Sequence, residues 1–194
     1  MTTANPPNDD LQRCFGGPAD LLMMRYHDEE WGVPVHDDRL LFEHLALDSF
    51  QAGLSWRTIL NKRESFRRAF EGFDPERVAR YTEDDIARLL GDAGIVRNLL
   101  KITATISNAQ RLLEVQRELG SFDSYIWQFT GHQTLRADNG VTMDSMPATS
   151  PESDAMSKDL KNRGFRFVGT TICYAFMQAT GMVNDHVDGC FRAP

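Results

Sequence analysis

Residues 82–113 read TEDDIARLLGDAGIVRNLLKITATISNAQRLL, and this stretch decides the fold that the sequence predicts. Thr82, followed three residues later by Asp85, is a capping box that opens a first helix. Apolar residues then recur at helical spacing, and a second run of the same spacing covers 99–113. Two helices joined by a short turn, here around Gly94, form a helical hairpin.

Helical spacing also dominates the chain outside this hairpin. An apolar stripe starts at Trp56, and Asp74-Pro75 places a cap before a proline that suits the first position of a helix. The tripeptide Asp-Asn-Gly at 138–140 predicts a turn that closes a small hairpin. The sequence has no internal repeat and no sustained strand alternation, so it predicts an all-α fold. Further helices are expected in segments 121–129, 153–163 and 173–181.

Length and composition limit the class of protein. With 194 residues, 41% of them hydrophobic, the chain suits a single domain, expected at 11–194 behind a flexible polar tail at 1–10. No stretch reaches the ~20 apolar residues that a membrane span needs, and the N-terminus lacks a secretory pattern. Three cysteines, an odd number, argue against a disulfide framework. We therefore expect a cytoplasmic monomer without an organic cofactor, whose cysteines are free thiols or metal ligands.

Charge is unevenly distributed along the chain. The net charge of −7 at first argues against a nucleic-acid partner. Segment 51–117, however, carries 12 basic and 9 acidic side chains, whereas 1–50 carries 3 and 10, and 118–194 carries 6 and 9. A locally basic middle suits a surface that faces phosphates. On charge alone, an ordinary solvated surface is the commoner explanation.

Cysteine and histidine residues near both ends of the chain form a candidate metal site. His186 and Cys190 are four residues apart, so one helical turn would place both on one face. A structural zinc needs four ligands, and Cys14 with His27 would complete a Cys₂His₂ set if the two ends meet. Such a site would clamp segments 11–30 and 180–194 together. Spacing alone leaves open that these residues bind no metal.

Four motifs are recognisable as a group, in this order along the chain: YHDEEWGVP at 26–34, QAGLSW at 51–56, DAGI at 92–95 and RGFRFVGTTICY at 163–174. Together with NDHVDGC at 184–190, they resemble the 3-methyladenine DNA glycosylase I (Tag) family. The resemblance runs from about residue 13 to residue 190, which is nearly the whole chain.

This resemblance implies a fold, a reaction and a set of site residues. The fold would be that of a helix-hairpin-helix glycosylase, with the hairpin of about 82–113 gripping double-stranded DNA. The reaction would be base-excision repair, in which the N-glycosidic bond of a flipped-out 3-methyladenine is hydrolysed and an abasic site remains. The damaged base would lie against Tyr26 and Trp56 beside the acidic Asp48. One structural zinc would be bound by Cys14, His27, His186 and Cys190.

These residue types suit the implied chemistry. A base inside a duplex must be extruded before an enzyme can reach it. Methylation at N3 gives adenine a positive charge and weakens its bond to the sugar, and aromatic faces attract such a cation. A carboxylate at Asp48 can accept a hydrogen bond from the adenine edge. Taken singly, Tyr26 and Trp56 are better explained by core packing, and the commoner place of an aspartate such as Asp48 is a helix surface or a helix cap.

Other residues are expected to contact the DNA around the lesion. Gln51 and Leu54 lie between the acid and the tryptophan, and one or both would fill the gap left by the extruded nucleotide. For Leu54, a place in the core is the alternative. The turn of the hairpin would present backbone N–H groups to phosphate. The expected phosphate contacts are Gly94, Arg97 and Lys101.

Two positions depart from the family pattern. The family usually has glutamate where this chain has Asp48, which is one methylene shorter. A family tryptophan just after the first zinc cysteine is missing, and Phe15 would supply part of that aromatic surface. A DNA-binding protein that recognises damage with weak or lost catalysis is therefore an alternative. A zinc hydrolase is another, and it would require an open coordination position on the metal.

Overall fold

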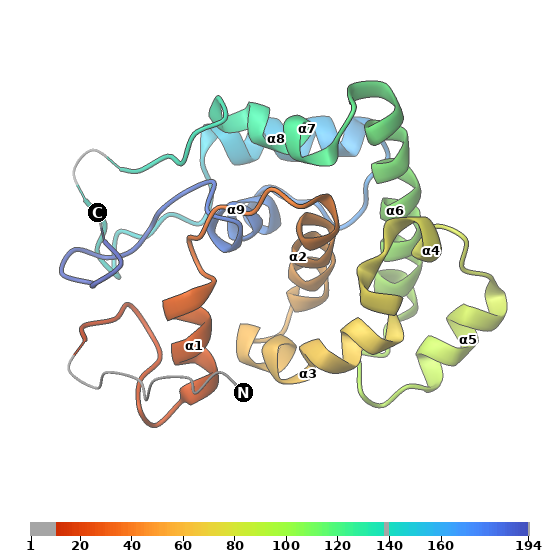
Figure 1. The fold of residues 1–194 in the computed structure, drawn as a ribbon, viewed down its shortest axis with the longest axis horizontal. Helices are drawn as coiled ribbons and strands as arrows, with labels where there is room; N and C mark the ends of the chain where they lie inside the picture. Colours follow the sequence, from red (N-terminus) through yellow and green to blue (C-terminus); the bar gives the residue numbers. More distant parts are fainter. Residues whose placement is uncertain (1–10, 138–139, 194) are drawn as a thin grey trace, which may run out of the picture.

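The computed structural model describes residues 11–137 and 140–193, and over these residues it is helical (Figure 1). Two isolated bridges occur there, and no β-strand, so the all-α prediction is confirmed. The elements are α1 (Leu21–Glu29), α2 (Asp38–Gln51), α3 (Trp56–Ala69), η1 (Glu71–Phe73), α4 (Pro75–Val78), α5 (Glu83–Gly91), α6 (Leu99–Leu119), α7 (Phe122–Trp127), η2 (Gln128–Thr130), α8 (Pro151–Asn162) and α9 (Thr170–Ala179).

Local capping signals explain why most of these helices begin where they do. The Thr82 N–H donates to the Asp85 carboxylate at 2.9 Å, which confirms the predicted capping box of α5. Asp74 caps α4, and Pro75 occupies its first position. Gly164, with φ of +86°, follows the end of α8. The predicted tail at 1–10 and two residues of the predicted turn at 138–140 lie outside the described residues.

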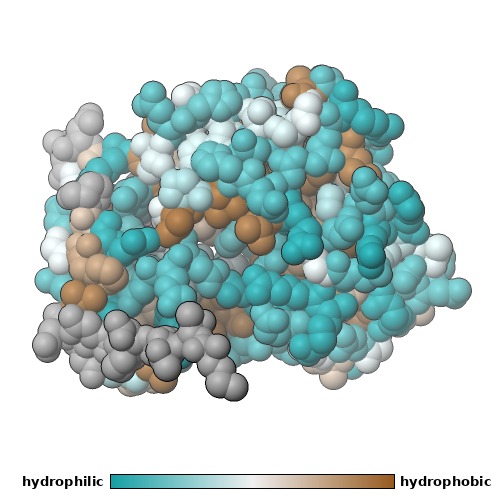
Figure 2. All heavy atoms as spheres, viewed as in Figure 1, coloured by the Kyte–Doolittle hydropathy of each residue, from teal (hydrophilic) through white to brown (hydrophobic). Residues whose placement is uncertain are grey.

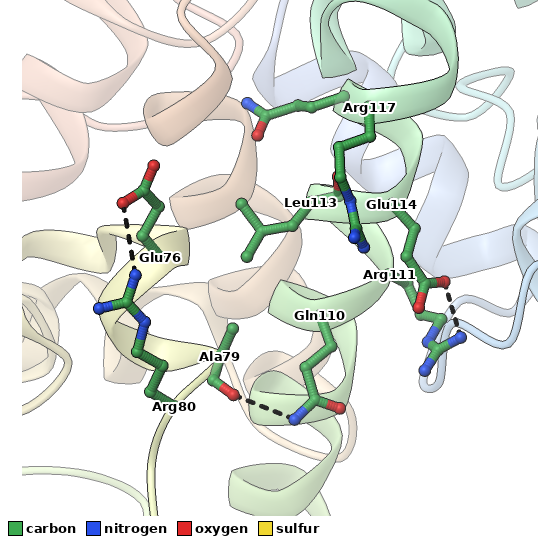
Figure 3. Close-up of a pocket in the computed structure, with 9 residues that line it drawn as sticks. Glu76, Ala79, Arg80, Gln110, Arg111, Leu113, Glu114 and Arg117 are labelled. Carbon is green, nitrogen blue, oxygen red and sulfur yellow. Dashed lines mark hydrogen bonds and ion pairs between the residues drawn. The ribbon is translucent and has the colours of Figure 1, made fainter.

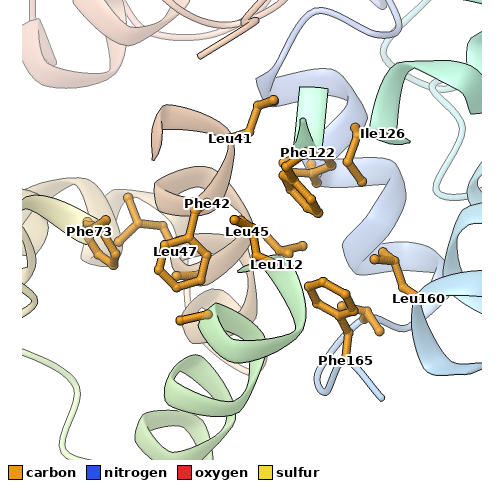
Figure 4. Packing of buried hydrophobic residues seen from close by; sticks show 14 of the residues in the cluster. Leu41, Phe42, Leu45, Leu47, Phe73, Leu112, Phe122, Ile126, Leu160 and Phe165 are labelled. Atoms are coloured by element: carbon orange, nitrogen blue, oxygen red, sulfur yellow. The ribbon is translucent and has the colours of Figure 1, made fainter. Parts of the chain in front are cut away.

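Helix α2 is the centre of the core. Every residue from Leu41 to Phe50 is buried, because α3, α6, α7 and α9 all pack against this one helix. Figure 4 shows Leu41, Phe42 and Leu45 of α2 among side chains from neighbouring elements. Complete burial of one such side chain stabilises the fold by about 1.5–3 kcal/mol. Polar groups on the same helix are consequently held away from water.

The segments before α1 and after α9 lie on the same side of the molecule (Figure 1). Backbone hydrogen bonds join them, including one from the Phe191 N–H to the Gln12 carbonyl at 3.0 Å. The prediction that His186 and Cys190 share a helical turn is wrong, because α9 ends at Ala179 and the chain from 184 to 190 is not helical, with a turn at 188–189. None of the helices in the described ranges is both apolar and long enough to cross a bilayer.

The face seen in Figure 2 is mostly hydrophilic, with hydrophobic residues gathered in a hollow near its middle. This hollow lies over the region where Figure 1 shows α2 and α9. The buried centre of the fold therefore comes close to the surface at this place.

Candidate active site and metal centre

Three helices converge on a cavity of about 220 Å³, which we call the aromatic cavity. Tyr26 comes from α1, Asp48 from α2, and Trp56 is the first residue of α3. The ring centroids of Tyr26 and Trp56 are 5.3 Å apart, and those of Tyr26 and Phe15 are 6.3 Å apart with an interplanar angle of 27°. The cavity is lined by Phe15, Met23, Tyr26, Trp31, Asp48, Gln51, Trp56, Met146, Ala175 and Gln178.

A tight turn between α2 and α3 fixes the place of Trp56. Gly53 has φ of +81°, a backbone conformation that favours glycine, and the Leu54 N–H donates to the Gln51 carbonyl at 2.6 Å. The Ser55 side chain then caps α3 by accepting a backbone N–H. The turn therefore delivers the indole to the cavity directly after the end of α2.

Asp48 is a buried acid without a partner. It is 4% exposed, and among the described residues its Oδ2 has no hydrogen-bond partner. Burial raises the pKa of this carboxyl well above its usual value. The indole Nε1 of Trp56 is also buried and unpaired. An unpaired buried polar group costs about 1–3 kcal/mol, so a ligand that satisfies both groups removes a cost from the protein.

The neighbouring polar groups are held neutral. Burial is the main cause that raises the pKa of the Tyr26 hydroxyl, and the nearby charges of Asp48 and Glu30 add to it. His44 lies one helical turn before Asp48, is buried, and has its pKa lowered to about 4 by burial. The aromatic cavity consequently combines flat apolar faces with a single carboxyl group, which suits a flat cationic ligand.

A second hollow of about 190 Å³, which we call the adjoining cleft, shares Asp48, Gln51 and Ala175 with the aromatic cavity. Leu54 lines the cleft and is 42% exposed, so its alternative place in the core is excluded. An exposed leucine beside the mouth of a cavity can insert into a partner without any rearrangement of the core.

The three predicted phosphate contacts lie elsewhere, on the hairpin formed by α5 and α6. Arg97 is exposed at its tip. The Gly94 N–H already donates to Asp92 at 2.7 Å, so it is not available to phosphate. Lys101 is 7% exposed, and its Nζ donates to the carbonyls of Phe50 and Ala52, so the prediction of a phosphate contact for Lys101 is corrected.

The four residues predicted as metal ligands do come together. The ligand atoms of Cys14, His27, His186 and Cys190 all lie within 4.8 Å of one another. The Cys190 Sγ is 3.3 Å from the His27 Nε2 and 3.5 Å from the His186 Nδ1. Tetrahedral zinc, with bonds of about 2.3 Å to sulfur and about 2.0–2.1 Å to nitrogen, separates sulfur from nitrogen by about 3.5 Å. The donor set and its spacing therefore fit such an ion.

Both histidines of this cluster are oriented by a hydrogen bond at the other ring nitrogen. The His27 Nδ1 is 2.8 Å from the Asp28 carboxylate, which also accepts from Arg13. The His186 Nε2 is 3.1 Å from the Trp31 carbonyl. Such outer hydrogen bonds select the tautomer that leaves one nitrogen free for a metal.

The cluster and the aromatic cavity share a segment of chain. Phe15 follows Cys14, and Tyr26 precedes His27, so two neighbours of ligand residues line the cavity. Trp31 contacts both the cluster and the cavity: its carbonyl is hydrogen-bonded to His186, and its ring lines the cavity. We therefore expect a change in the cluster to affect the position of the aromatic faces.

Sequence reasoning missed several residues of the cavity. Trp31 lies inside a motif used above, so its presence in that motif was an available signal. Gln178 from α9 and Met146 carried no such signal, because they are far along the chain from Tyr26, Asp48 and Trp56. Gln178 is fixed by its Nε2, which donates to Asp185 at 2.8 Å.

A hollow larger than the aromatic cavity and the adjoining cleft is a groove of about 680 Å³ between α4 and α6 (Figure 3). Arg80 pairs there with Glu76 at 3.8 Å, and Arg111 with Glu114 at 2.7 Å. None of the residues lining this groove lines the aromatic cavity or the adjoining cleft. Opposite charges that already pair with one another leave this groove with no unpaired buried group that would call for a ligand.

Comparison with solved structures and known families agrees with this geometry. A crystal structure of 3-methyladenine DNA glycosylase I (TAG) superimposes with a TM-score of 0.90 and 50% identity, covering 94% of this chain and all of the other. The structure of the TAG of Staphylococcus aureus, solved to show how it recognises 3-methyladenine, superimposes with a TM-score of 0.89 and 35% sequence identity. The match covers 95% of this chain and 97% of that chain. Fold and cavity together define a helical DNA glycosylase.

The sequence comparisons give the family within that class. A family model described as methyladenine glycosylase matches residues 17–193. DNA-3-methyladenine glycosylase 1 of Escherichia coli is 49% identical over 184 residues, which are 95% of this chain and 98% of that protein. The chain belongs to the methyladenine glycosylase family, as its motifs predicted.

Proposed function

We propose that this chain excises 3-methyladenine from alkylated DNA and that the lesion is held in the aromatic cavity. The enzyme class follows from the family, in which the relatives are DNA-3-methyladenine glycosylases. The observation that supports the site is the pairing of close aromatic rings with the buried, unpartnered Asp48. A cationic purine offers a π-face to the rings and a hydrogen-bond donor to the carboxyl.

The reaction needs little from the protein beyond binding and orientation. The cationic base leaves as neutral 3-methyladenine and takes the electron pair of the glycosidic bond. Water adds to the sugar carbon that the base has left and releases a proton to solvent, which leaves an abasic site. Since the leaving group already carries the positive charge, no strong general base is required. The role of the site is to stabilise the separating charges in a dry pocket.

Asp48 is proposed to recognise the charged form of the base. Without a ligand, burial favours its neutral form, because its pKa is raised. A cation in the cavity would favour the carboxylate, so lesion and acid stabilise each other's charge. Aspartate is one methylene shorter than the glutamate usual in the family, so this chain would hold the base closer to α2 or bridge the gap with a water.

The DNA around the lesion is proposed to be held by two elements. Leu54 from the adjoining cleft would fill the space left by the extruded nucleotide. The α5–α6 pair would act as the helix-hairpin-helix element, with Arg97 and the unpaired N–H groups at the start of α6 toward the phosphates. Gln51, which lines both hollows, would contact the edge of the gap.

The Cys₂His₂ cluster is proposed to bind one structural zinc. Its four residues would complete a tetrahedral shell, so no position would remain for a reactive water, and the ion would supply rigidity. This arrangement argues against the zinc hydrolase alternative. The ion would fasten Cys14, before α1, and His27, within α1, to the segment after α9, which carries His186 and Cys190.

The test is chromatography of the bases released from methylated DNA, with zinc measured on the same sample. Wild-type protein should release 3-methyladenine with one zinc per chain. Asp48→Asn and Trp56→Ala should lower the rate by about a hundredfold or more, since a lost stabilising group in a buried site is worth about 3 kcal/mol. Asp144→Asn, a change of an exposed loop aspartate, is the matched control. Lesion binding without base release would show a damage-recognising protein instead.

A further inference from the structure

Lys101 is buried at a place where its neighbours are exposed. It is the third residue of α6, and the two leucines before it are 50% and 68% exposed, whereas Lys101 is 7% exposed. Its side chain turns inward to the end of α2. There its Nζ donates to the Phe50 carbonyl at 2.8 Å and to the Ala52 carbonyl at 2.6 Å.

Those two carbonyl groups lie at the end of α2, where the turn that carries Leu54 begins. The last carbonyls of a helix have no partner within it, and a cation at this end is also favoured by the helix dipole. The ammonium group of Lys101 satisfies them and holds the chain where α2 ends and the turn begins. Beyond Ala52, the turn is set by Gly53 and presents Leu54 at the surface.

Lys101 therefore joins two elements that have separate tasks in the proposed function. The start of α6 is the part proposed to hold the DNA backbone, and the turn after α2 carries the residue proposed to enter the gap. Burial lowers the pKa of the Lys101 ammonium, whose Nζ donates to the carbonyl groups of Phe50 and Ala52. A buried ammonium is costly to maintain, and packing alone would be served by an apolar side chain.

We propose that Lys101 is a positioning residue, which fixes the distance between the gripped phosphate and Leu54 and thereby allows the base to be driven out of the duplex. This inference rests on the proposed function. Lys101 ties the start of α6 to the carbonyl groups at the end of α2, so the two elements move together. When the hairpin docks on DNA, Leu54 therefore enters the duplex to a fixed depth. Loss of the link would leave the cavity intact and impair only the extrusion of a paired base.

Lys62 of α3 provides a matched control, because it contacts the same hairpin. Its Nζ donates to the carbonyls of Ala93 and Gly94 at 3.0 and 3.2 Å, so it also joins a helix to the hairpin through carbonyls. It makes no contact with the α2–α3 turn in the described hydrogen bonds. Lys62→Met should therefore change DNA affinity without a selective effect on extrusion.

The experiment compares one methylated oligonucleotide annealed to its complement with the same strand alone, in which no pairing opposes extrusion. Lys101→Met removes the donors and keeps the stem. We expect it to lower single-turnover base release from the duplex by about ten- to a hundredfold, as for a lost charged hydrogen bond, and from the single strand by less than about threefold. Leu54→Ala should show the same selectivity. The double variant should be no slower than Leu54→Ala.

Several outcomes would overturn the inference. Equal losses on both substrates would mean a general structural role, as would weaker binding of free 3-methyladenine measured by tryptophan fluorescence. Independent, multiplying losses in the double variant would show that Lys101 does not act through Leu54. If the wild type released no 3-methyladenine, the proposed function would be wrong, and this inference would fail with it. If Lys101→Met does not fold by circular dichroism, Lys101→Gln, which keeps one donor group, takes its place.

Discussion

Asp48 shows how a sequence can point to a residue as a candidate for a site without revealing the physical state of its side chain. The family resemblance pointed to an acid at this position, and an acid on a helix surface or at a helix cap was the alternative. The structure excludes a cap, because Asp48 lies near the end of α2 and is 4% exposed. Burial of this kind depends on which elements cover a helix, and that information is not local in the sequence.

The unpaired carboxyl of Asp48 should lower the stability of the ligand-free protein as pH rises. Its folded-state pKa is raised, so its contribution favours folding at acid pH and is lost as pH increases from about 4 through that raised value. Asp48→Asn lacks this titration. Relative to wild type, the variant should therefore gain unfolding free energy between pH 4 and pH 8, by about 1.4 kcal/mol for each pH unit over which the wild-type carboxyl stays protonated only in the folded state.

Urea unfolding at the two pH values measures that gain, and the groups common to both proteins cancel in the difference. Asp144→Asn, on an exposed turn, should show the same difference from wild type at both pH values. A constant difference between Asp48→Asn and wild type would mean that the carboxyl has a partner in solution.

At the scale of elements, helices whose start signals or apolar spacing stand out in the sequence were predicted, whereas α2 was not, although Asp37 caps its start. Helix α5 has its capping box and α4 its proline, so their starts were readable. Helix α2 gave no amphipathic stripe because it is buried on all sides, and a fully surrounded helix has no polar face. The segment with His186 shows a helix predicted where there is none. His186 and Cys190 are four residues apart, which suggested a helix, but a non-helical segment brings these two ligand residues together.

The shared segment between the metal cluster and the aromatic cavity predicts a specific effect of metal removal. A chelator should weaken binding of free 3-methyladenine at least tenfold, because Phe15, Tyr26 and Trp31 lose their anchor and each aromatic face is worth about 1–3 kcal/mol. Quenching of tryptophan fluorescence measures the binding, and far-ultraviolet circular dichroism should show the helices retained.

Cysteine variants separate the metal from other effects of the chelator. Cys190→Ser should lose both zinc and base binding, whereas Cys173→Ala should keep both, since Cys173 is a buried core residue outside the cluster. Added zinc should restore the chelated wild type. If metal-free protein bound 3-methyladenine as tightly as before, the cluster would have no part in holding the aromatic faces of the cavity.

At the scale of the whole molecule, counting charges along the chain described the DNA-facing surface only in part. The segment 51–117 has an excess of basic side chains, yet Lys101 is buried and Arg67 pairs with Glu43 and Glu64. Ion pairing and burial depend on the packed structure, so the number of cations free for phosphate is smaller than the count. A protein of net charge −7 with few such cations should contact few phosphates.

Salt dependence tests that conclusion through one exposed arginine. Each neutralised phosphate contributes about −0.9 to the slope of log affinity against log salt. Arg97→Gln, at the tip of the hairpin, should therefore reduce the magnitude of the slope for kcat/KM on methylated duplex by about 1. Arg80→Gln, in the groove between α4 and α6, is the matched control: its side chain is 79% exposed, and the slope should not change (Figure 3). A slope altered equally by both variants would mean that the long-range charge of the molecule, and not a phosphate held by the hairpin, governs the encounter with DNA.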